Sequence, residues 1–270
     1  MREITRECVA YAFYGIQPEA EMLKSFYGEL IEWFSSVECP PEKLGVDAPG
    51  FSSKLIGFAR GHSRLCKLDF AQVESIEMYS LLPDAEIPLS HWWATASISV
   101  DRTPTFVLAA RCSVAMLEDC GLTRLIESCI RNLNPAYGIG YHRNHDEGPA
   151  FYAIGINYAQ TPEQDASASD ERESISRWGD VGLVDEVYRV GFLRDVYPLN
   201  YLTEPQLTTR VGDQTLQEWI SSSDSRGSLY DIENQMTRWK VPTDRIESVR
   251  GVLSEAGVII DWPSYIEQHP

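Results

Sequence analysis

Three stretches near the middle of the chain have the composition of β-strands and follow one another closely. Residues 75–82, 92–100 and 105–110 are rich in apolar, β-branched and aromatic side chains. Only the polar, proline-containing segment 101–104 separates the last two stretches, and it has the length of a turn. So short a connection favours an antiparallel meander, which constrains the fold of this chain more than any other feature.

Two amphipathic helices are predicted beside these strands. A β-rich run at residues 8–16 ends at Pro18, and from residue 19 onward apolar side chains recur at every third or fourth position. A second stripe of this kind covers residues 122–133 and stops at Asn134-Pro135. One apolar stripe on each helix indicates that each covers a sheet.

The C-terminal part of the chain has the order strand, helix, strand. Residues 236–241 have strand composition, Thr243 is predicted to cap a helix that ends at Gly257, and residues 258–260 are β-branched. Strands in groups with few helices between them predict an α+β fold, with a largely antiparallel sheet and amphipathic helices packed on one face.

We expect residues 1–270 to form a single α+β domain. The alternative is two similar halves, about 1–160 and 175–270, joined by an acidic loop rich in Ser and Ala. Residues 161–173 of that loop have no periodicity and no aromatic side chain, so they are predicted to be flexible.

Two further segments complete the predicted layout. Residues 42–61 contain several Gly and Pro residues and are predicted to be a long connection with one short element at most. Residues 136–141 and 151–157 are predicted to be the strands of a hairpin, with the polar loop 142–149 as its exposed tip.

The chain is strongly acidic, with 40 Asp and Glu residues against 23 Lys and Arg residues and a formal net charge of −17. Nucleic acid and anionic membranes are not expected partners, because binding to phosphate requires clustered cations. The charge favours encounter with a basic protein, although solubility alone also explains it. No uncharged apolar run of about 18 residues and no secretory signal is visible, so we expect a cytoplasmic protein.

Common catalytic signatures are absent from the sequence. It contains no nucleophile elbow, no P-loop and no dinucleotide-binding glycine motif between a strand and a helix, and we expect no cofactor. The pair Gly138 and Gly140 lies inside a strand pattern and indicates close backbone packing or a bulge. The cysteines show no C-x-x-C pair and are expected to be reduced, a disulfide framework being the alternative: Cys8, Cys39, Cys66, Cys112, Cys120 and Cys129.

The string from residue 142 to residue 147 is the most site-like in the chain. His142, His145 and Asp146 have the donor types that bind zinc or transfer protons, which makes a metal-assisted hydrolase the alternative function. Their spacing in a predicted loop differs from the helical arrangement in which two imidazoles share a face. A solvated polar turn is therefore favoured over a metal site.

A second candidate site is dense in Arg, Asp, Tyr and Asn. These residue types are frequent in protein interfaces, so the following residues are predicted to bind a partner: Arg194, Asp195, Tyr197, Asn200 and Tyr201. A strand that crosses into a turn is the structural alternative, because Pro198 forces the preceding residue into an extended conformation.

The segment 200–203, followed by Leu207 and by Val211-Gly212, resembles the type VI immunity family of bacterial proteins encoded beside secreted toxins. The shared spacing is aromatic-Leu-Thr, then Leu, then a hydrophobic residue and Gly. The resemblance implies a cytoplasmic antitoxin that has no catalytic residues and binds its cognate toxin. The leading hypothesis is therefore an immunity protein that occludes a toxin; self-association and a role as an assembly subunit stay open.

Overall fold

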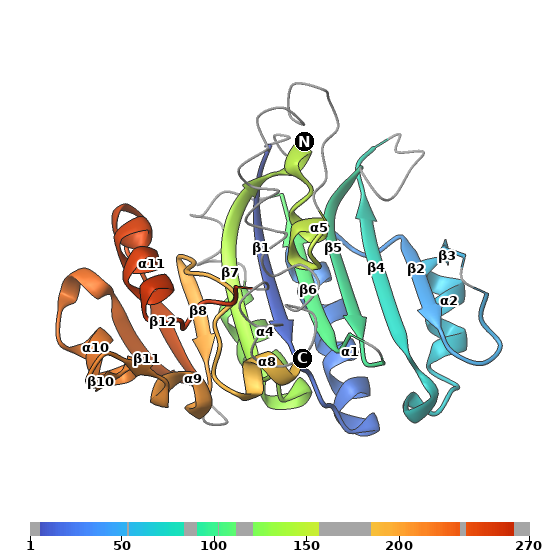
Figure 1. The fold of residues 1–270 in the computed structure, drawn as a ribbon. Coiled ribbons are helices and arrows are strands. Elements are labelled where there is room, and N and C mark those ends of the chain that lie inside the picture. Colours follow the sequence, from blue (N-terminus) through green and yellow to red (C-terminus); the bar gives the residue numbers. More distant parts are fainter. Residues whose placement is uncertain are drawn as a thin grey trace.

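A computed structural model describes residues 6–52, 54–83, 91–101, 103–111, 121–156, 185–232 and 236–261. Its main feature is one ten-stranded sheet in the order β11-β12-β8-β7-β1-β6-β5-β4-β2-β3 (Figure 1). Neighbouring strands pair antiparallel throughout. The predicted α+β class with a largely antiparallel sheet is confirmed, and β4, β5 and β6 form the predicted meander.

The strands of this sheet are β1 (Glu7–Tyr14), β2 (Lys43–Asp47), β3 (Ile56–Gly57), β4 (Ser75–Leu81), β5 (Trp92–Ser99), β6 (Thr105–Ala110), β7 (Tyr137–Asn144), β8 (Leu199–Leu202), β11 (Ser228–Ile232) and β12 (Met236–Lys240). A separate two-stranded ladder is formed by β9 (Arg210–Val211) and β10 (Gln214–Thr215). The helices are α1 (Ala20–Ser36), α2 (Phe58–Leu65), α4 (Leu122–Leu133), α5 (Pro149–Ala153), α8 (Asp185–Arg189), α9 (Glu204–Thr208), α10 (Leu216–Ser221) and α11 (Ile246–Glu255).

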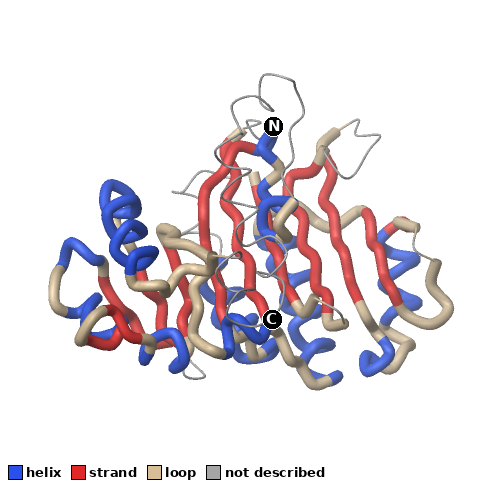
Figure 2. The backbone as a smooth tube through the Cα atoms, in the orientation of Figure 1, coloured by secondary structure: helices blue, strands red, loops and turns tan. Residues whose placement is uncertain are grey.

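Helices cover both faces of the sheet. The long helices α1 and α4 lie behind it in the view of Figures 1 and 2, and the short helices α5 and α8 lie in front. Strand β1 is buried along nearly its whole length because alternate residues serve the two cores, Phe13 on the α1 side and Tyr14 on the other. The sequence analysis did not predict α5 and α8, since a helix of five residues is too short to show a period.

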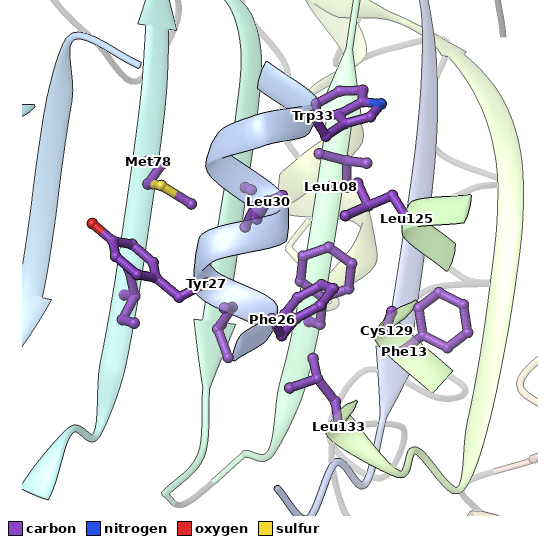
Figure 3. Close-up of a cluster of buried hydrophobic side chains, with 14 of the residues drawn as sticks. Phe13, Phe26, Tyr27, Leu30, Trp33, Met78, Leu108, Leu125, Cys129 and Leu133 are labelled. Atoms are coloured by element: carbon purple, nitrogen blue, oxygen red, sulfur yellow. The ribbon is translucent and has the colours of Figure 1, made fainter. Parts of the chain in front are cut away.

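The core beneath α1 and α4 is rich in aromatic side chains (Figure 3). The ring of Phe26 on α1 meets that of Phe106 on β6 edge to face, with the ring centroids 5.0 Å apart. Phe106 also stacks on Phe13 of β1, at a centroid distance of 6.4 Å. The predicted apolar stripes of α1 and α4 therefore bury this half of the sheet.

The predicted hairpin around residues 142–149 is wrong. Strand β7 runs on to Asn144 and pairs with β1 along its full length, and residues 145–147 form a 3-10 turn that Asn144 and Glu147 cap reciprocally. Residues 149–153, predicted as part of the tip and the start of the second strand, are helix α5, with Pro149 in its first turn. A short apolar run of this kind does not by itself distinguish a helix from a strand.

The predicted connection at 42–61 is more ordered than expected, since it contains β2, β3 and the start of α2. Its glycines allow close packing: a Cβ at Gly61 would lie 2.7 Å from Cδ2 of Leu44, so α2 approaches β2 only because Gly61 has no side chain.

The C-terminal predictions hold in part. Strand β12 is confirmed, but α11 begins at Ile246 with Arg245 as its N-cap, and Thr243 opens a preceding 3-10 turn. Gly257 follows the helix with a φ of 71°, as a residue that ends a helix does. Instead of a strand at 258–260, Ile259 forms a single parallel bridge with Leu193.

Some predictions lie partly or wholly outside the described residues. These are the flexible loop at 161–173 and the cysteines at positions 112 and 120. The four described cysteines form no disulfide: Cys8, Cys39, Cys66 and Cys129. Within the described ranges, no helix combines the length and the apolar character needed to cross a bilayer.

Candidate partner-binding site

A groove of about 910 Å³ lies on the α4 side of the sheet. The start of α4 forms one wall, strands β7, β8, β12 and β11 contribute to its floor, and residues 241–243 lie at one end. In Figure 1 these strands form the part of the sheet that extends beyond α4. The described helices α1 and α4 thus cover only part of this face.

Strand pairing places a single row of side chains across the covered and the open part of the face. Phe13 of β1 pairs with Gly138 of β7, which pairs with Tyr201 of β8. Tyr201 in turn pairs with Arg238 of β12, and Arg238 with Tyr230 of β11. Residues opposite each other in neighbouring strands point to the same face, so Tyr201, Arg238 and Tyr230 lie side by side on the groove floor.

Two glycines of β7 shape the edge of this floor. A Cβ at Gly138 would lie 2.5 Å from the ring of Phe13, and one at Gly140 would lie 2.8 Å from Cε1 of Tyr11. The aromatic rings of β1 therefore lie against the bare backbone of β7, as the predicted close packing requires. The centroids of the Phe13 and Tyr201 rings are 5.1 Å apart, so the aromatic layer continues into the groove.

The groove floor carries unpaired positive charge. The guanidinium of Arg238 lies 5.1 Å from the centroid of the Tyr230 ring. Its buried Nε has no hydrogen-bond acceptor, and no carboxylate in the described part of the chain forms an ion pair with it. Lys240 is two residues further along β12 and lines the same groove.

Three neighbouring groups modify this charge. Two acidic residues line the groove, Glu127 of α4 and Asp231 of β11. The carboxylate of Asp231 accepts a hydrogen bond from Thr237 at 3.3 Å, and its side chain alternates with that of Tyr230 along the strand. Helix α4 begins at Leu122, and its N-cap Gly121 supplies no side-chain cap, so the N–H groups of the first turn add positive potential to the wall.

Two titratable side chains of the groove respond to burial. Burial raises the pKa of Tyr201 well above its ordinary value, while Arg238 acts in the opposite direction. Burial lowers the pKa of His142, which Glu7 partly offsets. Both groups are therefore uncharged at neutral pH, and the fixed charges of the floor are those of Arg238 and Lys240.

All five residues predicted to bind a partner are buried. Arg194 is fully buried, and donates hydrogen bonds to the carbonyl of Ala153 at 2.8 Å, to that of Tyr152 at 2.6 Å and to the hydroxyl of Tyr14. Burial alone would lower the pKa of Arg194, but the surrounding tyrosine oxygens outweigh it and hold the pKa above its usual range. Arg194 thus joins residues that are far apart in the sequence.

Asp195, Tyr197 and Asn200 are also buried and take part in hydrogen bonds within the protein. The carboxylate of Asp195 receives a hydrogen bond at 2.6 Å from Nε of Arg250 on α11. The side chain of Asn200 bonds the backbone N–H and carbonyl of Tyr197 at 3.1 and 2.7 Å. Burial therefore removes most of the surface of all five residues. Tyr201, although only 3% exposed, is the one of the five that lines the groove.

The residues of the alternative metal site do not converge. His142 lines the groove, whereas the ring of His145 packs against Trp92 in the core of the opposite face, with the centroids 4.8 Å apart. Burial and the nearby Arg111 lower the pKa of His145 to about 4, and its Nδ1 lies 3.5 Å from Asp146. The described residues contain no group of three or more His, Cys, Asp or Glu side chains placed to hold a metal ion.

The segment that carries the family resemblance forms a cap and a turn. Thr203 is the N-cap of α9 and shares a reciprocal capping box with Gln206. Gly212 has a φ of 63° in the tight turn between β9 and β10, a conformation that favours glycine. The sequence did not find the groove itself, although alternating Met236, Arg238 and Lys240 indicate a strand face of mixed polarity.

Neither a protein-family model nor a curated protein sequence matches this chain. Among solved structures, the Pseudomonas aeruginosa T6SS protein PA0821 is similar to it with a TM-score of 0.60 and 12% identity, over 94% of this chain and 73% of that chain. At this identity, the likeness shows a shared fold. The structure of the toxic C-terminal tip of CdiA from Pseudomonas aeruginosa in complex with immune protein matches with a TM-score of 0.25 and 11% identity, over 50% of this chain and 85% of that chain, and carries no argument.

Proposed function

We propose that this chain is a non-catalytic, cytoplasmic bacterial immunity protein, which neutralises a cognate toxin of a type VI secretion system by binding and occluding it. The observation that carries the proposal is the groove, an open amphipathic surface with aromatic side chains and unpaired cations, as expected of an interface. The family resemblance at residues 200–212 supports the toxin context, and the likeness in fold to a T6SS protein of Pseudomonas aeruginosa supports the link to that secretion system. The net charge of −17 favours a partner that is basic overall.

A growth assay tests this function. The chain is co-expressed in Escherichia coli with the product of each reading frame that flanks its gene. We expect one product to arrest growth and the chain to restore growth and to form a complex with that product on size-exclusion chromatography. The absence of a toxic neighbour, or a toxic neighbour that the chain neither binds nor neutralises, would contradict the proposal.

A matched pair of variants tests whether the groove is the binding surface. Tyr230 at the groove and Met22 on α1 are both large exposed side chains, with exposed fractions of 46% and 41%. We expect Tyr230→Ala to weaken the complex by about tenfold or more, as loss of an aromatic anchor does, and Met22→Ala to leave it unchanged. Equal effects of the two variants would place the interface elsewhere.

A further inference from the structure

We propose, building on the function above, that the partner inserts a segment with a carboxylate side chain next to an apolar side chain, and that Arg238 and Lys240 bind this carboxylate at the groove floor. The partner is therefore a protein that is basic overall but presents an acidic, apolar loop to this one surface. Charge, an unpaired donor and the shape of the groove each support this occupant.

The groove is less acidic than the chain as a whole, because its lining has two basic side chains, Arg238 and Lys240, against two acidic ones, Glu127 and Asp231. The protein has a net charge of −17, but its floor presents Arg238 and Lys240, and its wall presents the uncapped N-terminal turn of α4. Neither Glu127 nor Asp231 forms an ion pair with Arg238 in the described structure. A carboxylate is thus favoured at this place, and a basic side chain is repelled by the floor.

Arg238 lacks the acceptors that an arginine in a partly buried position usually has. Its Nε is buried and has no hydrogen-bond partner among the described residues. The ring of Tyr230 on β11 lies against the guanidinium, and Tyr201 on β8 is the paired residue on the opposite side of β12. The planar guanidinium matches the two oxygens of a carboxylate, and such a pair is strong where water is partly excluded. An inserted carboxylate would supply acceptors that the described residues do not provide.

The surroundings of Arg238 also select for an apolar neighbour of the carboxylate. Leu199, Tyr201 and Tyr11 contribute to the floor, and Leu122 and Ile126 to the wall. The volume of about 910 Å³ is at the upper end of the roughly 300–1,000 Å³ of typical ligand sites. The groove can therefore take a few adjoining side chains of a protein loop.

Nuclear magnetic resonance titration of the full ¹⁵N-labelled chain tests this occupant. The probes are three blocked pentapeptides that differ in their central residue: Gly-Phe-Asp-Leu-Gly, Gly-Phe-Asn-Leu-Gly and Gly-Phe-Lys-Leu-Gly. We expect the Asp peptide to shift amide signals of β8, β11, β12 and the start of α4 at about millimolar concentration, and the Asn peptide to bind roughly tenfold more weakly. The Lys peptide is expected to leave these signals unchanged.

Variants of the same chain locate the bound carboxylate. Arg238→Gln should lower the affinity for the Asp peptide by roughly tenfold, and Arg238→Lys should restore part of it. The matched control Arg60→Gln, at an exposed position on the distant helix α2, should have no effect. Thermal unfolding of each variant confirms that it is folded. The proposal would be overturned if the Asp peptide left the amide signals of the groove unchanged, or if the Asp and Lys peptides bound equally well. It would also be overturned if Arg238→Gln bound the Asp peptide as tightly as the wild type does.

Sedimentation of the unliganded chain tests for a second copy as the occupant. We expect the same monomer mass for the wild type and Arg238→Gln; a dimer that this substitution dissociates would assign the groove to self-association and overturn the proposal. The growth assay keeps this result separate from the function. Protection from a toxin without binding of the Asp peptide would reject only the carboxylate anchor, whereas peptide binding without a toxic neighbour would reject only the immunity function.

Discussion

One face of the sheet is sealed at β1 and β6 and open at β8, β12 and β11. In the sealed part, Phe13 and Phe106 pack under Phe26 of α1. The same cross-strand row continues into the open part with Tyr201, Arg238 and Tyr230. The strand pairing continues unchanged across both parts, whereas the residue types change where the helices end. The covering layer therefore decides which strands build a core and which build a surface.

The largest expected effect tests the difference in burial directly. Phe26→Ala should lower the free energy of unfolding by about 3–5 kcal/mol, because a fully buried ring is lost and a cavity is left. Tyr230→Ala should lower it by less than about 1 kcal/mol, because almost half of that side chain is already exposed. Urea unfolding measures both values, and similar losses would remove the distinction between the two parts.

A pH titration sharpens the comparison at the end of β7, where His142 lines the groove and His145 is buried. His145 has a pKa of about 4 in the folded state against an ordinary value of 6.5. Above pH 6.5 it is neutral in both states, whereas between pH 6.5 and about 4 the unfolded chain binds a proton that the folded chain does not. The free energy of unfolding should therefore decrease as the pH is lowered from 6.5 to about 4, by up to about 3 kcal/mol.

His145→Gln serves as the test variant. Urea unfolding at a series of pH values should give a shallower fall in stability for this variant than for the wild type. Parallel curves for the two proteins would show that His145 is not the group that titrates.

At the boundary between the two parts, Gly138→Ala should destabilise the protein by roughly 1–3 kcal/mol. The added methyl group would overlap the ring of Phe13 and crowd Tyr201, whose Cβ would be 3.2 Å away. Gly251→Ala is the matched control, because nothing lies within 4 Å of its Cβ position. Thermal unfolding of the pair should show a loss for Gly138→Ala alone; equal melting temperatures would mean that the ring moves aside.

The smallest expected effect lies in the open part. Arg238→Met should change the free energy of unfolding by less than about 1 kcal/mol, and towards greater stability, because it removes a buried Nε donor that has no acceptor among the described residues. Chemical denaturation at neutral pH measures the change. A loss of several kcal/mol would show that Arg238 supports the fold.

The elements that the sequence predicted are those with a repeating pattern. The stripes of α1 and α4 and the strands β1, β4, β5 and β6 are long enough for their periodicity to identify them. Strand β3 and helix α5 have two and five residues, and no period can be read at that length. The predicted hairpin failed for this reason, since Pro149 opens a helix whose apolar residues also fit a strand.

Most of the candidate site could not be predicted from the sequence, because the order and register of the strands bring its residues together. Tyr11, Ile126 and Arg238 come from segments far apart in the chain, and only the order of strands in the sheet brings them to one groove. The residue types that suggested an interface at 194–201 are the same types that satisfy buried hydrogen bonds, as Arg194 and Asn200 do. Composition alone does not separate these two uses.

The position of β8 between β7 and β12 has a consequence for the newborn protein. Until residues 199–202 have been synthesised, the β8-facing edge of β7 has no strand to pair with, and the carbonyl of Ala153, which also accepts from Tyr14, lacks its hydrogen bond from Arg194. At a translation rate of roughly 5–20 residues per second, this bare edge persists for several seconds. A ribosome that pauses after residue 156 prolongs that interval, so slow codons in this region should increase aggregation without any change in the amino-acid sequence.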